Sequence, residues 1–326
     1  MKPTLGRITL ALLCLCASAT AARSQVATPT PAPSATPTPA PSASPQPSAT
    51  PATPQAPPST DIFLVPLSGA GLELKAGEPR RLTDWEGYDN QPSFTPDGRA
   101  VLYTSIRADG QADIYRYDLA RGASERVTQT PESEYSPTVT PDGKHFSVIR
   151  VEGDGTQRLW KFPLAGGAPS LVLEKTKPVG YHVWADKDTL MLFILGEPVT
   201  MQLVDTGTEL TGTVATNIGR GLARVPGAEK ISYVHKVSSD EWLIKEFDLK
   251  THRKATLVRA LAGSEDYAWT PDGALVMAQG GKLYAWRPGG AGDWKEFADL
   301  SAAGLGRVTR IAVSPRGDML AVVAQK

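Results

Sequence analysis

Three segments of the chain end in the same four residues, Thr-Pro-Asp-Gly. They are Pro92-Ser93-Phe94-Thr95-Pro96-Asp97-Gly98, Pro137-Thr138-Val139-Thr140-Pro141-Asp142-Gly143 and Tyr267-Ala268-Trp269-Thr270-Pro271-Asp272-Gly273. A fourth segment, Ile311-Ala312-Val313-Ser314-Pro315-Arg316-Gly317, differs mainly at Arg316. In such a turn, proline presets φ, aspartate hydrogen-bonds to nearby backbone, and glycine adopts positive φ. Each segment therefore predicts an apolar strand that ends in a tight turn.

The spacing of these turns indicates an internal repeat. Roughly 45 residues separate the first two copies and roughly 44 the last two, whereas the interval between them is about 130, or three periods. Two degenerate copies are therefore expected in that interval. They begin at Trp184-Ala185-Asp186-Lys187-Asp188 and Arg224-Val225-Pro226-Gly227, and an apolar run follows each. The repeat thus occurs six times.

Each repeat contains four short segments typical of strands. After the turn comes a second strand, such as residues 100–104. A third strand carries an aromatic pattern, such as Asp113-Ile114-Tyr115-Arg116-Tyr117, and a short fourth strand follows, such as residues 125–129. Four antiparallel strands in about 43 residues form one propeller blade. The sequence therefore predicts an all-β fold over residues 61–326, a six-bladed β-propeller of four-stranded antiparallel blades.

The two ends of this region predict how the ring closes. The last copy supplies only two strands and ends near residue 324, whereas residues 61–67 match the third-strand pattern and residues 80–83 a fourth strand. We expect these segments to complete one composite blade, because closure leaves only short, protected strand edges.

These repeats resemble the TolB-like propeller family, whose blades carry the same Ser/Thr-Pro-Asp-Gly-Lys/Arg turn and the later Asp-Ile-Tyr strand. The likeness covers residues 61–326. TolB itself also has an α/β domain before its propeller, and here a proline-rich segment takes that place. The resemblance implies the propeller fold and a location in the cell envelope for a relative of TolB that is not TolB itself.

The first residues are typical of a secretory signal peptide, which we place at residues 1–22. Lys2 and Arg7 precede an apolar run over residues 8–17, and small residues with an A-x-A pattern follow. The sequence therefore predicts a periplasmic or secreted protein without a transmembrane segment after cleavage. The alternative is a membrane anchor, through an uncleaved signal or lipidation at Cys14 or Cys16. No cysteine follows Cys16.

Residues 23–60 are predicted to be a disordered linker rich in Pro, Ala, Thr and Ser. The octad Ala27-Thr28-Pro29-Thr30-Pro31-Ala32-Pro33-Ser34 recurs unchanged over residues 35–42, and no charged residue occurs between Ser24 and Thr60. Such a composition buries too little apolar surface to fold, and its prolines favour an extended polyproline II conformation. We interpret it as a spacer or as a tolerated insertion, with O-glycosylation as a further possibility.

The charge balance and the missing motifs narrow the possible functions. The chain has 34 basic and 34 acidic residues, without the basic excess of a nucleic-acid binder. The four histidines show no metal-ligand spacing, and neither H-E-x-x-H nor G-x-S-x-G occurs. We therefore expect no cofactor, no metal site, no catalytic residues and no enzymatic activity.

The repeat register places a ring of polar and aromatic residues just before each innermost strand, at one end of the central channel. The candidates for binding a ligand or partner there are Tyr135, Tyr181, His182, Arg220, Asp266 and Arg310. Arginine and tyrosine are frequent hot-spot residues at protein interfaces.

The leading hypothesis is a monomeric, exported, non-enzymatic propeller that binds another envelope protein or a peptide, or acts as a scaffold. The alternative is a metal-dependent enzyme of the lactonase, lyase or hydrolase type with its site in the channel. A purely structural spacer and cap is a third hypothesis.

Overall fold

The computed structural model describes residues 57–290 and 292–325. The predicted signal peptide, both cysteines and the linker up to residue 56 lie outside the described residues. Within the described part, the chain forms 25 strands and two short 3-10 helices, η1 (Gly71–Glu73) and η2 (Ser301–Ala303). None of these helices has the length and apolar character needed to cross a bilayer. The fold is all-β, as predicted.

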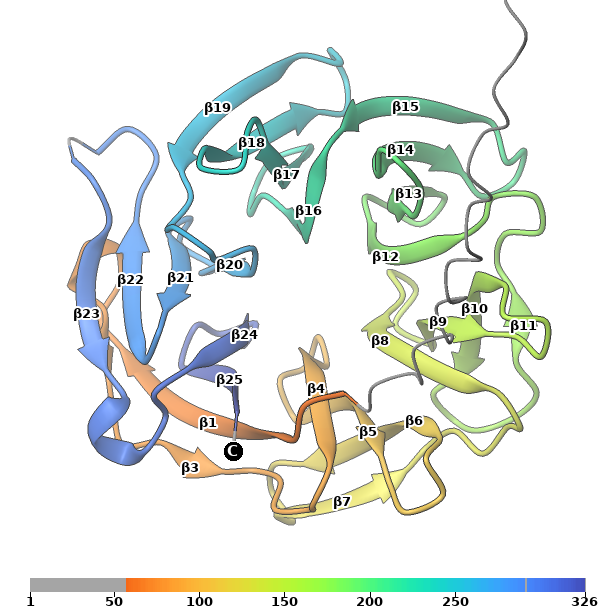
Figure 1. Ribbon diagram of the computed structural model, residues 1–326, viewed down its shortest axis with the longest axis horizontal. Helices are drawn as coiled ribbons and strands as arrows, with labels where there is room; N and C mark the ends of the chain where they lie inside the picture. Colours follow the sequence, from red (N-terminus) through yellow and green to blue (C-terminus); the bar gives the residue numbers. More distant parts are fainter. Residues whose placement is uncertain (1–56, 291, 326) are drawn as a thin grey trace, which may run out of the picture. The chain divides into compact units, whose positions relative to one another are not determined.

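Four antiparallel sheets have four strands each and follow one another along the chain (Figure 1). They correspond to the second to fifth copies of the repeat, so both degenerate copies form complete sheets. Their strands are β8 (Ser133–Val139), β9 (His145–Val151), β10 (Gln157–Pro163) and β11 (Ser170–Leu171); β12 (Val179–Trp184), β13 (Thr189–Ile194), β14 (Thr200–Asp205) and β15 (Thr211–Thr216); β16 (Ile218–Arg224), β17 (Lys230–Lys236), β18 (Trp242–Asp248) and β19 (Lys254–Arg259); β20 (Tyr267–Trp269), β21 (Leu275–Gln279), β22 (Lys282–Trp286) and β23 (Lys295–Asp299).

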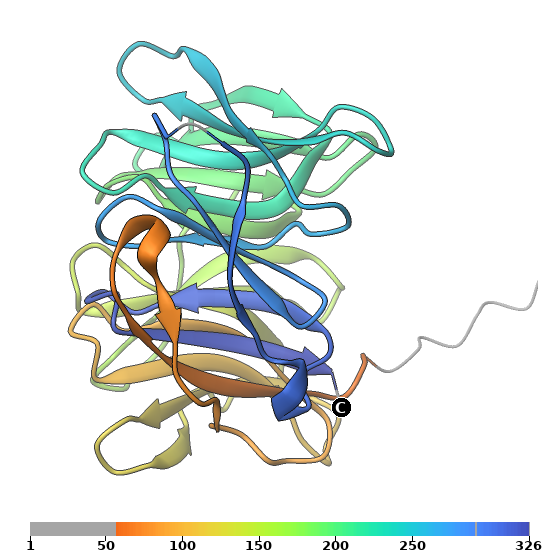
Figure 2. The ribbon, with the colours of Figure 1, turned by 90° about the vertical axis from the view of Figure 1, so that its left-hand side faces the viewer.

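A nine-stranded sheet contains the two ends of the described chain. β1 pairs with β25 over seven residue pairs, from Thr60↔Gln325 to Pro66↔Met319, and β3 pairs with the other edge of β1. Thr60↔Tyr88 is the single parallel bridge from β1 to β4. Figure 2 shows β1 alongside the last strands. The strands are β1 (Thr60–Ser68), β2 (Lys75–Ala76), β3 (Arg80–Arg81), β4 (Tyr88–Phe94), β5 (Ala100–Ile106), β6 (Ala112–Asp118), β7 (Ala123–Arg126), β24 (Val308–Val313) and β25 (Met319–Gln325).

The Thr-Pro-Asp-Gly turn is held by its own side chains. The hydroxyl of Thr95 donates to Asp97 Oδ1 at 2.6 Å, and the N–H of Gly98 donates to the Thr95 carbonyl at 2.8 Å. Gly98 has φ of 65°, a conformation that glycine adopts without steric cost. The same Thr–Asp hydrogen bond, also 2.6 Å, recurs at Thr140–Asp142 and Thr270–Asp272.

The core lies between the sheets, and alternate residues of a strand point into different layers. In β1, Ile62 and Leu64 pack with Val101 and Tyr103 of β5. Val65 and Leu67, by contrast, pack in a layer with residues of β21 and β22, such as Leu283. Successive strand side chains point to opposite faces, so a strand that is buried on both faces is apolar at nearly every position.

A buried serine on the second strand joins two neighbouring sheets. Ser232 of β17 donates its hydroxyl to the Ala223 carbonyl, at 3.2 Å. It accepts hydrogen bonds from the next sheet, from Tyr267 Oη at 2.9 Å and Trp269 Nε1 at 2.8 Å. A single hydroxyl oxygen thus satisfies a phenol and an indole that the apolar core would otherwise leave without partners.

The same arrangement recurs at Ser147 of β9. Its hydroxyl lies 3.2 Å from the Thr138 carbonyl and accepts a hydrogen bond from Trp184 Nε1 at 2.9 Å, while His182 Nε2 lies 2.7 Å away. Because the serine proton points to the carbonyl in this pattern, Nε2 carries the imidazole proton. His182 Nδ1 then has no hydrogen-bond partner in the described part of the chain. Burial lowers the pKa of His182 to about 3.

Ser232→Ala is expected to lower the free energy of unfolding by about 2 to 4 kcal/mol, because it leaves the Tyr267 hydroxyl and the Trp269 N–H buried and unsatisfied. Urea denaturation measures the effect. Ser239→Ala, at an exposed turn position, is the matched control and should change stability little. Equal stabilities of the two variants would contradict this role of Ser232.

His182 should make stability depend on pH below about 6.5. Its pKa is lower in the folded chain, so the unfolded chain binds a proton there first, and stability falls as pH falls from 6.5 toward 3. Between pH 6.5 and pH 5 the contribution is about 1.5 kcal/mol. Denaturation curves of wild type and His182→Gln across this range should show a shallower dependence in the variant, and parallel curves would refute the assignment.

Candidate functional site

The innermost strands surround the centre of the fold in Figure 1, and most carry a β-bulge near the same end. A bulge re-aims the side chains around it. The pairing register shifts between Asn90 and Ser93, Tyr135 and Thr138, Val179 and Tyr181, Ile218 and Leu222, and Val308 and Arg310. At two bulges, Gln91 and Ser136 have positive φ, and the Gln91 side chain accepts a hydrogen bond from the Ser136 N–H at 2.8 Å.

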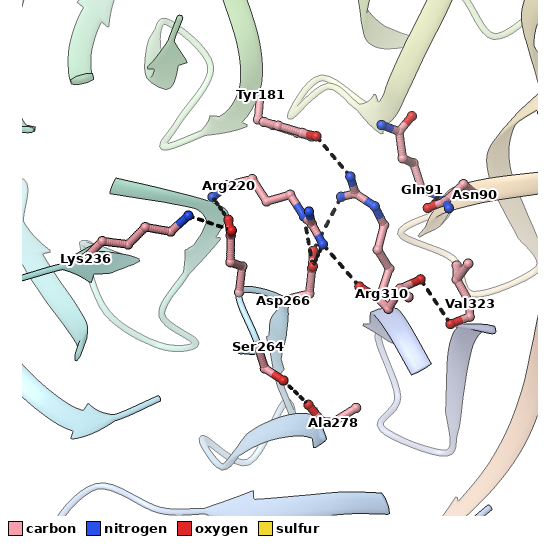
Figure 3. A network of polar contacts seen from close by, with 12 residues as sticks. Asn90, Gln91, Tyr181, Arg220, Lys236, Ser264, Asp266, Ala278, Arg310 and Val323 are labelled. Carbon is pink, nitrogen blue, oxygen red and sulfur yellow. Dashed lines mark hydrogen bonds and ion pairs between the residues drawn. The ribbon is translucent and has the colours of Figure 1, made fainter. Parts of the chain in front are cut away.

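Asp266, immediately before β20, lies between two arginines (Figure 3). Arg220 of β16 donates from Nε to Asp266 Oδ2 at 2.9 Å and also pairs through Nη2. Arg310 of β24 donates from Nη1 to Asp266 Oδ1 at 3.4 Å and from Nη2 to the Tyr181 hydroxyl at 3.0 Å. We call Arg220, Asp266, Arg310 and Tyr181 the channel cluster. The sheets that carry it are far apart in sequence.

The cluster carries a net positive charge. Its two guanidinium groups share one carboxylate, and the side chains of Asp266 and Arg310 are each 16% exposed. The pKa of Arg220 is raised, because the charge and hydrogen bonds of Asp266 outweigh the opposing effect of burial. Both arginines therefore stay protonated at any physiological pH, and the cluster can accept an additional anionic group.

A second ion pair supports the position of Arg220. Glu265 accepts from the Arg220 backbone N–H at 3.0 Å and from Lys236 Nζ at 2.6 Å. Burial alone would raise the pKa of Glu265, but these hydrogen bonds lower it. Gly221 permits the close approach of the two segments, because a Cβ there would stand 2.3 Å from the Glu265 carbonyl oxygen.

Two small hollows of about 190 Å³ each meet at the channel cluster, and both are lined by Arg220, Asp266, Arg310 and Ile311. The first also includes Arg307, Glu265 and Thr309, and the second includes Gln91, Ser136 and Tyr181. Each is smaller than the roughly 300 Å³ at which pockets begin to enclose drug-sized ligands. Their size suits a side chain or a short peptide segment.

Tyr88 is a site residue that the repeat register did not indicate. Burial raises its pKa to about 12, and Arg310, Tyr181 and Tyr135 all lie within electrostatic reach of it. Burial likewise raises the pKa of Tyr135, so both phenols stay neutral and can donate hydrogen bonds at neutral pH. The position of Tyr88 at the start of the strand before Pro92 was the available signal.

The structure thus brings together four of the six predicted residues, Tyr181, Arg220, Asp266 and Arg310. Tyr135 packs beside the core formed by residues such as Ile149. His182 contributes to the wall of the second hollow, but its imidazole points to Ser147 in the core. Within residues 57–290 and 292–325, no group of three or more His, Cys, Asp and Glu side chains has an arrangement that could hold a metal ion.

Comparisons with known proteins agree on the fold. No curated protein sequence matches the chain. A protein from Agrobacterium tumefaciens assigned as TolB has 15% identity and a TM-score of 0.64, over 83% of this chain and 99% of that one. TolB from Acinetobacter baumannii has 15% identity and a TM-score of 0.53, over 82% and 64% of the two chains. An oligogalacturonate lyase in complex with manganese has 18% identity and a TM-score of 0.51, over 76% and 80%.

At such identities these likenesses concern the fold alone, and they include both TolB proteins and an enzyme. The family is established by sequence, since the model of the TolB β-propeller domain matches residues 19–208, more than half of the chain. The strand order, the Thr-Pro-Asp-Gly turns and this match agree: the chain belongs to the TolB β-propeller domain family.

Proposed function

We propose that the protein is an exported, non-enzymatic, six-bladed propeller that binds a protein or peptide of the cell envelope at the channel cluster. In this proposal, residues 1–22 are a signal peptide, residues 23–60 a linker and residues 61–326 a propeller closed by a composite blade. Two observations support closure: the pairing of β1 with β25, and the contacts of β24 with both β20 and β4.

A location in the periplasm, or outside the cell, follows from the predicted signal peptide and from membership of the TolB family. The predicted signal and the proline-rich linker are expected to place a monomeric domain at a distance from its point of attachment or export. The partner would then be another envelope protein or a segment of one.

The observation that carries the binding proposal is the excess of positive charge at the hollows. Arg220 and Arg310 share Asp266, Arg307 lines the first hollow, and Glu265 is already paired with Lys236. A guanidinium forms short, charge-assisted hydrogen bonds with a carboxylate. An acidic side chain or a carboxyl terminus of the partner is therefore the chemistry that fits, with the phenols of Tyr181 and Tyr88 as neighbouring donors.

The double variant Arg220→Ala/Arg310→Ala should weaken partner binding at least about tenfold, equivalent to about 1.4 kcal/mol. A photo-crosslinking amino acid at Tyr181, used in intact cells, would identify adducts, and their yield would report binding. Raised salt should also reduce the yield, because the attraction is between charges that are partly exposed.

The matched control is Arg121→Ala/Arg316→Ala, which removes the same charge from side chains that are 61% and 64% exposed. Equal crosslinking in both double variants would refute the channel cluster as the binding site. Elemental analysis of the purified chain adds a second decision. A stoichiometric metal ion that is lost in Asp266→Asn would favour the channel enzyme instead.

A further inference from the structure

A second hollow of about 580 Å³ lies beside the segment that joins β3 to β4, and its lining is predominantly aromatic and apolar. We call it the Trp85 groove. Leu82, Trp85, Tyr103 and Tyr115 contribute to it. Trp85 is 47% exposed, which is unusual for the largest apolar side chain. An exposed aromatic in a concave apolar site indicates a binding surface.

The walls of the Trp85 groove are held in place. The Arg107 guanidinium lies between two rings, 4.9 Å from the centroid of Trp85 and 4.7 Å from that of Tyr115. Asp89, which is buried, pairs with Arg107 at 3.6 Å and balances its charge. The rings of Tyr103 and Tyr115 are 5.8 Å apart. The groove is therefore a preformed aromatic surface without excess charge, which suits an uncharged apolar ligand.

The first described residue of the chain lies next to this groove. Pro57 lines an adjoining hollow of about 350 Å³, together with Trp85, Arg107 and Ala108, and these three residues also line the Trp85 groove. The entry of the chain is fixed there, because Ser59 Oγ and the Thr60 N–H both donate to the Gly87 carbonyl, at 3.0 and 2.9 Å. The residues before Pro57 therefore start at the edge of the groove.

The spacing of prolines changes at this end of the linker. Over residues 29–47 prolines are separated by two or four residues, whereas Pro51, Pro54 and Pro57 are separated by three. A polyproline II helix has three residues per turn, so these three prolines occupy one face. At 3.1 Å per residue they span about 19 Å. Within the linker, only this segment presents a continuous proline face.

We propose that residues 51–57 bind the Trp85 groove of the same chain as a polyproline II helix. Aromatic grooves bind such helices because the ligand is already extended and loses little entropy on binding. The covalent connection at Pro57 raises the effective concentration of the segment, so modest contacts are sufficient. The base of the linker is then part of the folded domain, and the free spacer begins near residue 50.

The test uses the exported chain labelled with 5-fluorotryptophan and observed by ¹⁹F NMR. The Trp85 signal is assigned by its loss in Trp85→Phe, a substitution at a half-exposed position that the fold should tolerate. Pro51→Ala/Pro54→Ala should shift the Trp85 signal and leave the other six tryptophan signals in place. A synthetic peptide of residues 49–58 added to this variant should restore the wild-type position, and added to wild type it should have no effect.

The matched control is Pro45→Ala/Pro47→Ala, which removes two prolines from the part of the linker without the three-residue spacing. It should leave the Trp85 signal unchanged. The same Trp85 signal in both double variants would overturn the proposal. A wild-type signal that moves on dilution would also overturn it, because the segment would then come from a second copy. Raised salt should not release the segment, since it is uncharged.

Discussion

The pairing of β1 with β25 is the interaction on which the rest of the structure depends. It joins residues more than 250 positions apart and places the first described strand inside a sheet. β1 buries Ile62 and Leu64 in one layer of the core and Val65 and Leu67 in another. Arg310 lies on β24, one strand away from β25, so the geometry of the channel cluster depends on this pairing.

Much of the fold was predictable because the decisive chemistry is local. In the Thr-Pro-Asp-Gly turn, donor and acceptor are two residues apart, so the sequence alone indicates the hydrogen bond. The fourth copy shows the limit of this reading. Arg316 replaces the aspartate, and Asp318 takes its role, accepting from the Ser314 hydroxyl at 2.7 Å. The two-residue strand β2 has no such signal, because it pairs with β1 through only two residues.

The site was predictable in part. The register identified which residues begin the innermost strands, but it contains no information on which of them meet. Arg310 and Tyr181 are 129 positions apart, and their contact depends on the bulges at each strand. The inward direction of His182 had a signal in the sequence: His182-x-Trp184 matches Tyr267-x-Trp269, and both pairs bond to a buried serine.

The two proposed binding surfaces differ in chemistry and so can act independently. The channel cluster attracts an anionic group and responds to salt, whereas the Trp85 groove takes an uncharged proline face and does not. Docking of residues 51–57 removes about seven residues from the spacer, which shortens its maximum reach by about 20 Å. It also fixes the direction in which the linker leaves the domain, because Thr60 is held beside Tyr88 at the start of β4. A linker docked in this way sets the orientation of the channel relative to its attachment, which a freely jointed spacer cannot do.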